Sequence, residues 1–211
     1  MLSLVAPLAY VYGLSTLFIA SSFTKNDHVT CSSDPKTDNF VRFCGCSVCH
    51  FGYESNRQEK TQLICEYARK YNQRIPVRVC WESTGGKNCC SCEKCYRTMM
   101  EFYAERENPK NYGFDYAENR FPQIMGNLQR VSIKKKYLIE SQEALRRNYT
   151  YKEIIPELRW VYKKDFSRVE GVCYQHKKIK LSRRIYCKSP KFIKRILSRV
   201  VKLKNKFKGS K

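Results

Sequence analysis

The chain has 211 residues and a formal net charge of +22, with 41 Lys and Arg against 19 Asp and Glu. This length suits one ordinary domain with an extension. With 42% hydrophobic and 28% charged residues the chain can bury a core, which argues against wholesale disorder, and its 9 glycines exclude a collagen-like repeat.

The charge is unevenly placed along the chain. Residues 1–120 hold 15 basic and 13 acidic side chains, whereas residues 121–211 hold 26 and 6. We therefore predict an α/β body over residues 1–115 and a basic, mostly helical extension over residues 116–211. A basic arm over residues 121–211 favours an anionic partner, either nucleic acid or an anionic membrane surface.

The first segment, Leu2–Thr24, carries no charge and admits two interpretations. It is long enough to cross a bilayer. However, Pro7 and Gly13 interrupt it, and a signal peptide would need an early basic residue, which the segment lacks. We favour a buried helix over Leu2–Tyr12, followed by a buried strand of a parallel sheet over Thr16–Ala20.

Caps and apolar spacing predict the elements that follow. A short strand is expected within residues 40–50. Ser55 is a good N-cap, and Gln58 three residues later completes a capping box, so a helix is predicted over Asn56–Tyr71. The apolar alternation of Val77–Cys80 predicts a strand.

The second half of the chain is predicted to be mainly helical. Apolar spacing favours a helix over Glu93–Glu107 and further helices near 121–147, 151–164 and 190–206. The last of these is basic and amphipathic, which suits an anionic membrane surface, nucleic-acid phosphates, or simple packing on the body. Strands alternating with helices over the first part indicate one α/β layer with a helical tail.

Four of the twelve cysteines are spaced as ligands of one metal ion. Cys80, Cys89, Cys92 and Cys95 form the pattern Cys-x8-Cys-x2-Cys-x2-Cys. Gaps of two residues turn neighbouring sulfurs toward one point, and zinc in structural sites prefers four tetrahedral thiolates. Cys90 could take the place of Cys89. The alternative is a set of reduced thiols that share a loop.

The predicted zinc loop, residues 80–95, is closed by four cysteines, so a structural rather than catalytic zinc is expected. Lys87, Lys94 and Arg97 could offset the negative charge of a zinc tetrathiolate. No Ser/His/Asp or Cys/His triad can be assembled from the sequence, and the catalytic residues stay unknown.

A second cysteine group lies before the first long helix. Cys44, Cys46, Cys49 and His50 could supply ligands for a second metal ion. The alternative is a group of thiols in a strand that bind nothing.

Several motifs together resemble a known enzyme family. They are Ala20-Ser21-Ser22, the segment from Gly52 to Lys60, Val79-Cys80-Trp81 and the segment from Asn88 to Thr98. They resemble the C-terminal half of PP-loop ATP pyrophosphatases, such as 7-cyano-7-deazaguanine synthase of queuosine biosynthesis, and uncharacterised relatives from bacterial polysaccharide gene clusters. The resemblance covers residues 5–115 and implies a partial Rossmann-like (adenine nucleotide alpha-hydrolase-like) layer. Separately, the clustered cysteines suit metal binding in a reducing compartment, so a cytoplasmic protein is expected, with the basic arm as a peripheral contact with the membrane.

The same resemblance implies roles for charged residues beside these motifs. Glu54, Arg57, Glu59 and Lys60 would face a substrate crevice, whereas the simpler interpretation is a solvated first helical turn with ion pairs. Arg97 and Thr98 would bind an anion, although helix capping and charge balance explain them as well.

The sequence lacks one motif of this family, and its absence determines which function we expect. The family holds ATP on a Ser-Gly-Gly-x-Asp-Ser loop, which this sequence lacks, and Ser83-Thr84-Gly85-Gly86 has no Asp after it. The resemblance therefore implies a zinc-binding C-terminal portion that is non-catalytic alone, or that works with a separate nucleotide-binding half. ATP is not expected to bind this chain alone. The alternative is a zinc-stabilised binding module whose basic arm docks on nucleic acid or an anionic membrane surface.

Overall fold

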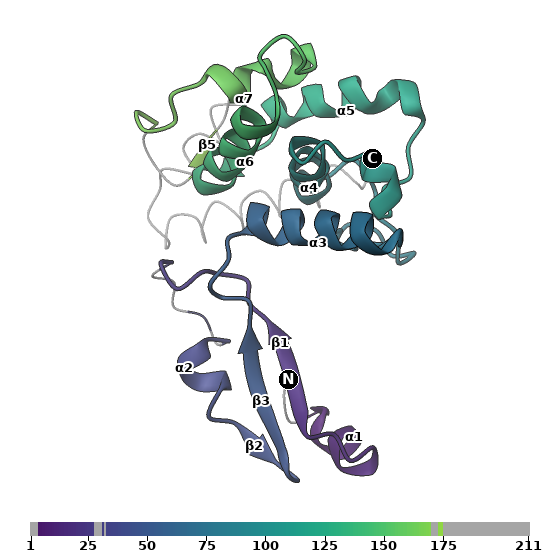
Figure 1. Cartoon of the computed structure of the whole chain (residues 1–211), viewed down its shortest axis with the longest axis vertical. Helices are drawn as coiled ribbons and strands as arrows, with labels where there is room; N and C mark the ends of the chain where they lie inside the picture. The colour runs from purple at the N-terminus through teal and green to yellow at the C-terminus, as the bar shows by residue number, and fades with distance from the viewer. Residues whose placement is uncertain (1–3, 28–30, 32, 170–172, 175–211) are drawn as a thin grey trace, which may run out of the picture. The chain divides into compact units, whose positions relative to one another are not determined.

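The computed structural model describes residues 4–27, 31, 33–169 and 173–174 (Figure 1). The chain divides into two compact units, Met1–Lys60 and Thr61–Lys211. The first is built on a small sheet and the second is mainly helical, so the described chain is mixed α/β. The predicted helix over 190–206 lies outside the described residues. Among the residues described, no helix has the length and apolar character needed to cross a bilayer.

The first unit is a three-stranded mixed sheet with strand order β1-β3-β2. β1 (Thr16–Ala20) is parallel to β3 (Cys46–Phe51), and β2 (Arg42–Phe43) is antiparallel to β3. The strand predicted over Thr16–Ala20 is confirmed, as is a short strand in the 40–50 region. The short helix α2 (Pro35–Asp38) contacts β3 (Figure 1).

The sheet of this unit leaves one face open. Thr16, Phe18 and Ala20 are exposed, and Phe18 and Phe51 lie edge to face with ring centroids 5.8 Å apart while 62% and 64% exposed. The expectation of a buried β1 is therefore wrong for the described residues. The physical reason is that α2 covers only the face that carries Val48 and His50, and alternation sends the other side chains to the opposite face.

The first helix is shorter and more exposed than predicted. α1 (Ala6–Val11) starts at a proline-bearing first turn and buries only Ala9. Leu8 is 52% exposed and Tyr10 is 73% exposed. A buried helix over Leu2–Tyr12 is thus not what the described residues form, because no described residue of this unit covers Leu8, Tyr10 or Val11 enough to bury it.

The helix after the sheet has its cap one residue later than predicted. α3 (Arg57–Tyr71) follows Asn56, whose side-chain oxygen accepts from the Glu59 amide at 2.9 Å. The Glu59 carboxylate in turn accepts from the Asn56 amide at 2.7 Å. This is a reciprocal capping box of Asn56 and Glu59, in place of the expected Ser55 and Gln58.

The second unit is organised around α4 (Glu93–Ala104), which confirms the helix predicted from residue 93. Met99, Met100 and Phe102 on α4 are fully buried, and the Phe102 ring stacks on Tyr112 at 4.1 Å. The shared core runs from Cys65 to Phe166, so side chains on both sides of residue 115 belong to it.

The helices around α4 are shorter than the predicted segments. The region 121–147 holds α5 (Phe121–Gly126), η4 (Asn127–Arg130), β4 (Ile133–Lys134) and α6 (Lys135–Asn148). Further on lie η5 (Pro156–Leu158), α7 (Arg159–Lys163) and β5 (Cys173–Tyr174), which pairs antiparallel with β4. Two 3-10 turns, η2 (Pro109–Tyr112) and η3 (Glu118–Arg120), connect α4 to α5.

Candidate metal centre

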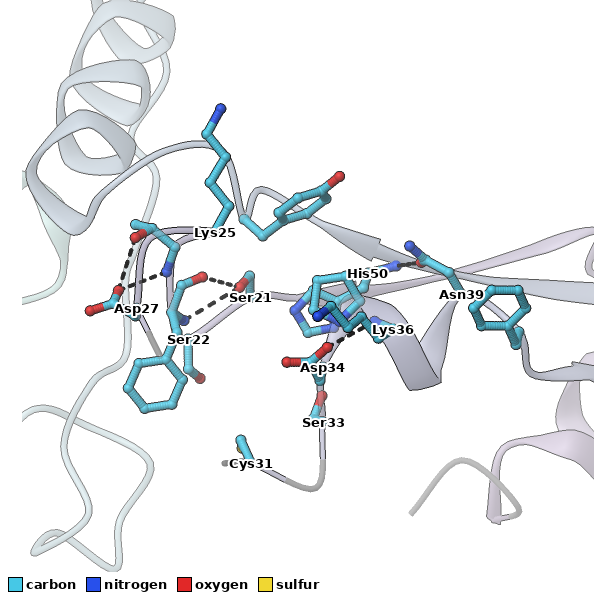
Figure 2. A pocket seen from close by; sticks show the side chains of 15 residues that line it. Ser21, Ser22, Lys25, Asp27, Cys31, Ser33, Asp34, Lys36, Asn39 and His50 are labelled. Atoms are coloured by element: carbon cyan, nitrogen blue, oxygen red, sulfur yellow. Dashed lines mark hydrogen bonds between the residues drawn. The ribbon is translucent and has the colours of Figure 1, made fainter. Parts of the chain in front are cut away.

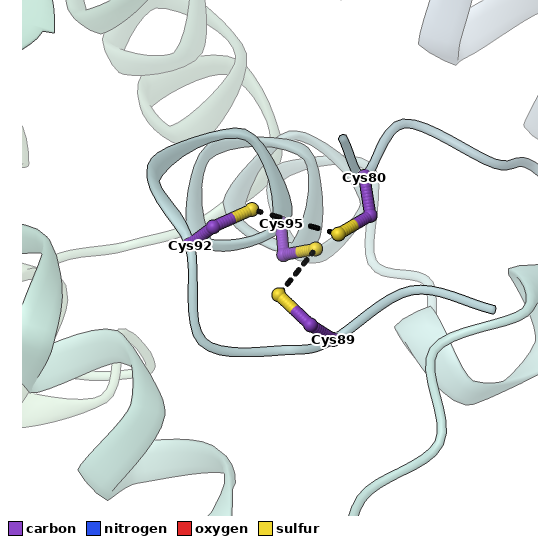
Figure 3. A group of neighbouring side chains, drawn as sticks. All are labelled: Cys80, Cys89, Cys92 and Cys95. Atoms are coloured by element: carbon purple, nitrogen blue, oxygen red, sulfur yellow. Dashed lines mark hydrogen bonds between the residues drawn. The ribbon is translucent and has the colours of Figure 1, made fainter. Parts of the chain in front are cut away.

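Four cysteine side chains of the second unit converge on one point (Figure 3). Cys80 ends an extended segment, Cys89 lies in the loop that follows, Cys92 is the N-cap of α4, and Cys95 is in its first turn. All four sulfur atoms lie within 4.8 Å of one another. The four residues predicted from their spacing are therefore the four that the fold gathers, and the cluster is compatible with a metal site.

The distances between the sulfur atoms fit a tetrahedral ion. The Cys80 and Cys92 Sγ atoms are 4.0 Å apart, and those of Cys89 and Cys95 are 3.9 Å apart. A tetrahedron with zinc–sulfur bonds of about 2.3 Å has edges of about 3.8 Å. A disulfide would need sulfur atoms about 2.05 Å apart, so these four are not oxidised pairs.

The structure decides between Cys89 and Cys90 as the ligand. Cys90 has a positive φ of 52° and is not one of the four gathered residues, and its thiol donates to the Asn88 carbonyl oxygen at 3.8 Å. Burial raises the pKa of the Cys90 thiol to about 11. Cys90 is therefore a neutral buried thiol beside the site, and the Cys89 sulfur occupies the ligand position.

Asn88 holds the extended segment that carries Cys80. Its side-chain oxygen accepts from the Val79 amide at 3.0 Å and the Cys80 amide at 3.3 Å. Its side-chain nitrogen donates to the carbonyl oxygens of Val77 at 2.7 Å and Gly113 at 3.0 Å. One buried amide thus satisfies four main-chain groups.

This role of Asn88 also corrects the strand predicted over Val77–Cys80. The segment has no strand assignment and no sheet partner among the described residues. Its amides and carbonyls bond to the Asn88 side chain and, at the Val77 amide, to the Tyr112 carbonyl oxygen. Buried main-chain groups need partners, and a side chain serves here in place of a neighbouring strand.

The electrostatics differ between the four thiols. Burial alone would raise the pKa of Cys80, but hydrogen bonds from the Cys89, Ser83 and Glu82 amides outweigh it and lower that pKa to about 6. The pKa of Cys95 is raised, mainly by burial and further by Cys92. A divalent cation would relieve the repulsion between neighbouring thiolates, and the N-terminus of α4 adds a favourable partial positive charge.

Two of the three cations expected to offset the cluster, Lys94 and Arg97, have other partners. Lys94 lies over the Trp81 ring, 3.1 Å from its centroid. Arg97 is buried, donates from Nε to Glu93 at 2.9 Å, and stacks over the Tyr137 ring at 4.1 Å. The α4 dipole and the amides around Cys80 therefore stabilise the thiolates more directly than these side chains do.

The second cysteine group does not form a metal site. Cys46 and His50 are buried on one face of β3, while Cys49 points to the opposite face and Cys44 precedes the strand. The structure does not gather three of these four side chains around one point. Alternation along a strand separates residues of opposite parity, which the sequence spacing alone did not reveal.

The charged residues singled out by the resemblance are mostly engaged in local structure. Glu59 belongs to the cap of α3, and the Lys60 ammonium donates to the Ser21 carbonyl oxygen at 3.0 Å. Thr98 is buried within α4. The reciprocal cap of Asn56 and Glu59 fits the interpretation of Glu59 as part of a helical first turn better than that of a residue facing a substrate crevice.

Comparisons of the chain with protein-family models, with curated proteins and with solved structures find no match.

Proposed function

We propose that this chain is the zinc-binding C-terminal portion of a PP-loop ATP pyrophosphatase-like protein, which acts with a nucleotide-binding half that these 211 residues do not contain. The observation that carries the proposal is the gathering of the Cys80, Cys89, Cys92 and Cys95 sulfur atoms within 4.8 Å of one another. Four thiolates leave no open coordination position, so the ion is structural. We favour zinc because four soft thiolate ligands are typical of structural zinc sites.

The zinc assignment is tested by a matched pair of variants in the same loop. Cys92→Ser removes a ligand, whereas Cys90→Ser changes a neighbouring thiol that is not part of the group of four and bonds to the Asn88 carbonyl oxygen. We expect one zinc per chain in the wild type and in Cys90→Ser, measured by elemental analysis, and less than half of that in Cys92→Ser.

The same pair tests the structural role of the ion. A structural zinc contributes on the order of 10 kcal/mol to local folding, which is comparable to the whole stability of a domain. Cys92→Ser should therefore lose the cooperative thermal transition, while Cys90→Ser keeps it. Equal zinc content in the two variants would contradict the assignment.

The open sheet of the first unit supports a partner half. Parallel strands in α/β proteins are normally covered on both faces, yet Phe18 and Phe51 are exposed on one face. β1 stands at the edge of the sheet, with a strand neighbour on one side only among the described residues. An α/β fragment could pair with this uncharged edge and cover the apolar face.

Calorimetry tests whether ATP binding requires a separate nucleotide-binding half. The chain alone should give no heat of ATP binding, because it carries no Ser-Gly-Gly-x-Asp-Ser loop. Adding a protein that carries such a loop and is encoded beside this chain should give a complex, and Phe18→Asp should weaken that complex. ATP binding to the isolated chain would refute the proposed division.

The alternative proposal is a zinc-stabilised binding module whose basic arm docks on an anionic surface. The observation in its favour is the excess of 26 basic over 6 acidic residues in 121–211. Phosphate contacts release counterions, so binding of the full chain to RNA or to phosphatidylserine vesicles should weaken steeply between 50 and 200 mM salt. Absence of binding to both at low salt would exclude this alternative.

A further inference from the structure

A buried carboxylate–imidazole pair lies in the first unit, apart from the cysteine cluster. Asp38 at the end of α2 and His50 near the end of β3 are both 4% exposed. The His50 Nδ1 atom is 2.8 Å from the Asp38 Oδ2 atom, which also accepts from the Ser33 hydroxyl at 2.7 Å. The Asn39 side chain accepts from the His50 amide at 2.7 Å, so both ring and backbone are held.

The pair fixes which ring nitrogen is available. A carboxylate only accepts hydrogen bonds, so Nδ1 carries a hydrogen and donates it to Asp38, which leaves Nε2 as the ring nitrogen available to a ligand. Burial would raise the pKa of Asp38, but hydrogen bonds from Ser33 and His50 outweigh it, and the pKa is lowered. Asp38 therefore stays ionised and keeps the imidazole oriented.

The other ring nitrogen faces a cavity rather than the core. A histidine that serves only packing has both nitrogens satisfied. Nε2 of His50 has no hydrogen-bond partner among the described residues, and it does not belong to their buried, unpartnered polar atoms. His50 instead lines a cavity of ≈ 700 Å³ (Figure 2).

The cavity lies where ligands of α/β sheets usually bind. Ser21 and Ser22 directly follow β1, and Tyr53 follows β3, so the cavity is at the carboxyl ends of the two parallel strands. In open sheets this end is the usual ligand crevice. Hydroxyl groups and the aromatic ring of Tyr53 line it, a mixture typical of small-molecule sites.

The rim of the cavity is suited to an anion. Lys25 and Lys36 line it, and neither ammonium group has a hydrogen-bond or ion-pair partner among the residues described. The two carboxylates of the rim already accept hydrogen bonds from the main chain: Asp27 from the Thr24 amide and Asp34 from the Lys36 amide. Both carboxylates keep their negative charge, so the rim has no net positive charge, and what it offers an anion is the two ammonium groups as donors.

We propose that this cavity binds a small anion that carries a hydroxyl or amino group, with His50 Nε2 as the acceptor of that group's hydrogen and Asp38 as the residue that positions the imidazole. Lys25 and Lys36 hold the anionic end. The site goes beyond the proposed function and does not depend on it, because all of its residues belong to the first unit and none to the zinc loop.

The test uses the full chain with His28→Gln and His176→Gln, so that His50 is the remaining histidine. Diethyl pyrocarbonate acylates accessible neutral imidazoles, and mass spectrometry counts the product. We expect His50 to react in the folded protein. Inorganic phosphate, which carries both anionic oxygens and a hydroxyl, should slow the reaction about tenfold at ten times its dissociation constant. A His50 that reacts only after unfolding would overturn the proposal.

The lysines and the aspartate have separate controls. Lys25→Gln with Lys36→Gln should remove the protection by phosphate, whereas Lys70→Gln on the exposed surface of α3 should keep it. Protection that survives the double substitution, or that chloride gives equally at matched ionic strength, would overturn the anion site.

For Asp38→Asn, side-chain nitrogen NMR should show His50 losing its single Nδ1–H tautomer while the circular dichroism spectrum is unchanged. An unchanged tautomer would overturn the positioning role of Asp38.

Discussion

Asn88→Ala is the sharpest test of how the cysteine cluster is built. The substitution removes four hydrogen bonds and leaves the Val79 and Cys80 amides and two carbonyl oxygens without their partner. A hydrogen bond contributes about 1 kcal/mol net, and an orphaned buried group costs more than that. Some of these groups will find water, so we expect a loss of about 3 kcal/mol in unfolding free energy.

The consequence should appear in both stability and metal content. A loss of this size lowers Tm by about 10 °C in a protein of this length. Because the Cys80 amide is one of the released groups, the Cys80 sulfur is no longer fixed and zinc should dissociate more readily in competition with a chromophoric chelator. Circular dichroism melting and chelator titration measure the two effects.

The control for this variant is Asn111→Ala, which changes an exposed asparagine in η2 of the same unit. It should melt within about 2 °C of the wild type, since surface substitutions rarely change stability by more than about 0.5 kcal/mol. If Asn88→Ala melts as the control does and keeps its zinc, the reasoning about the extended segment fails.

Two further predictions concern the core of the second unit. Arg147→Met removes the ion pair of 3.0 Å with Glu105, whose side chain is 4% exposed. Since the arginine itself is half exposed, urea unfolding should show a loss of about 1 to 2 kcal/mol, against no measurable loss for Arg168→Met at the exposed pair with Asp165. Burial raises the pKa of the Cys65 thiol from 9.0 to about 12, so the folded chain keeps a proton that the unfolded chain releases. Stability should fall as pH rises from 9 toward 12, and more gently in Cys65→Ala; an equal slope in denaturant titrations across this range would contradict the assignment.

The parts of the fold that the sequence predicted are those decided by near neighbours. The strand over Thr16–Ala20 is a short apolar run bounded by Ser15 and Ser21, and the helix from Glu93 follows from apolar spacing of 3.6 residues. The cluster of four cysteines was predictable for the same reason, because gaps of two residues bring sulfurs together within one turn of chain.

The sites that the sequence missed depend on distant partners. Asn88 entered the sequence analysis only as the first residue of the motif from Asn88 to Thr98, and its bond to Gly113 reaches 25 positions along the chain. The pair of Asp38 and His50 joins a helix to a strand 12 positions away. The alternation of Cys46, Val48 and His50 in β3 was the available signal, since it places His50 on the covered face and separates it from Cys49.

By itself, then, the sequence predicted the cysteine cluster, with Cys90 left open as an alternative to Cys89, together with the surplus of positive charge after residue 120 and several elements of the body. Only the tertiary structure decided that the Asn88 side chain, and not a neighbouring strand, binds Val77–Cys80, that Cys90 is outside the cluster, and that β1 keeps an open face. The physical reason is that spacing and propensity act over a few residues. Burial and hydrogen-bond satisfaction depend on which distant groups arrive at the same place.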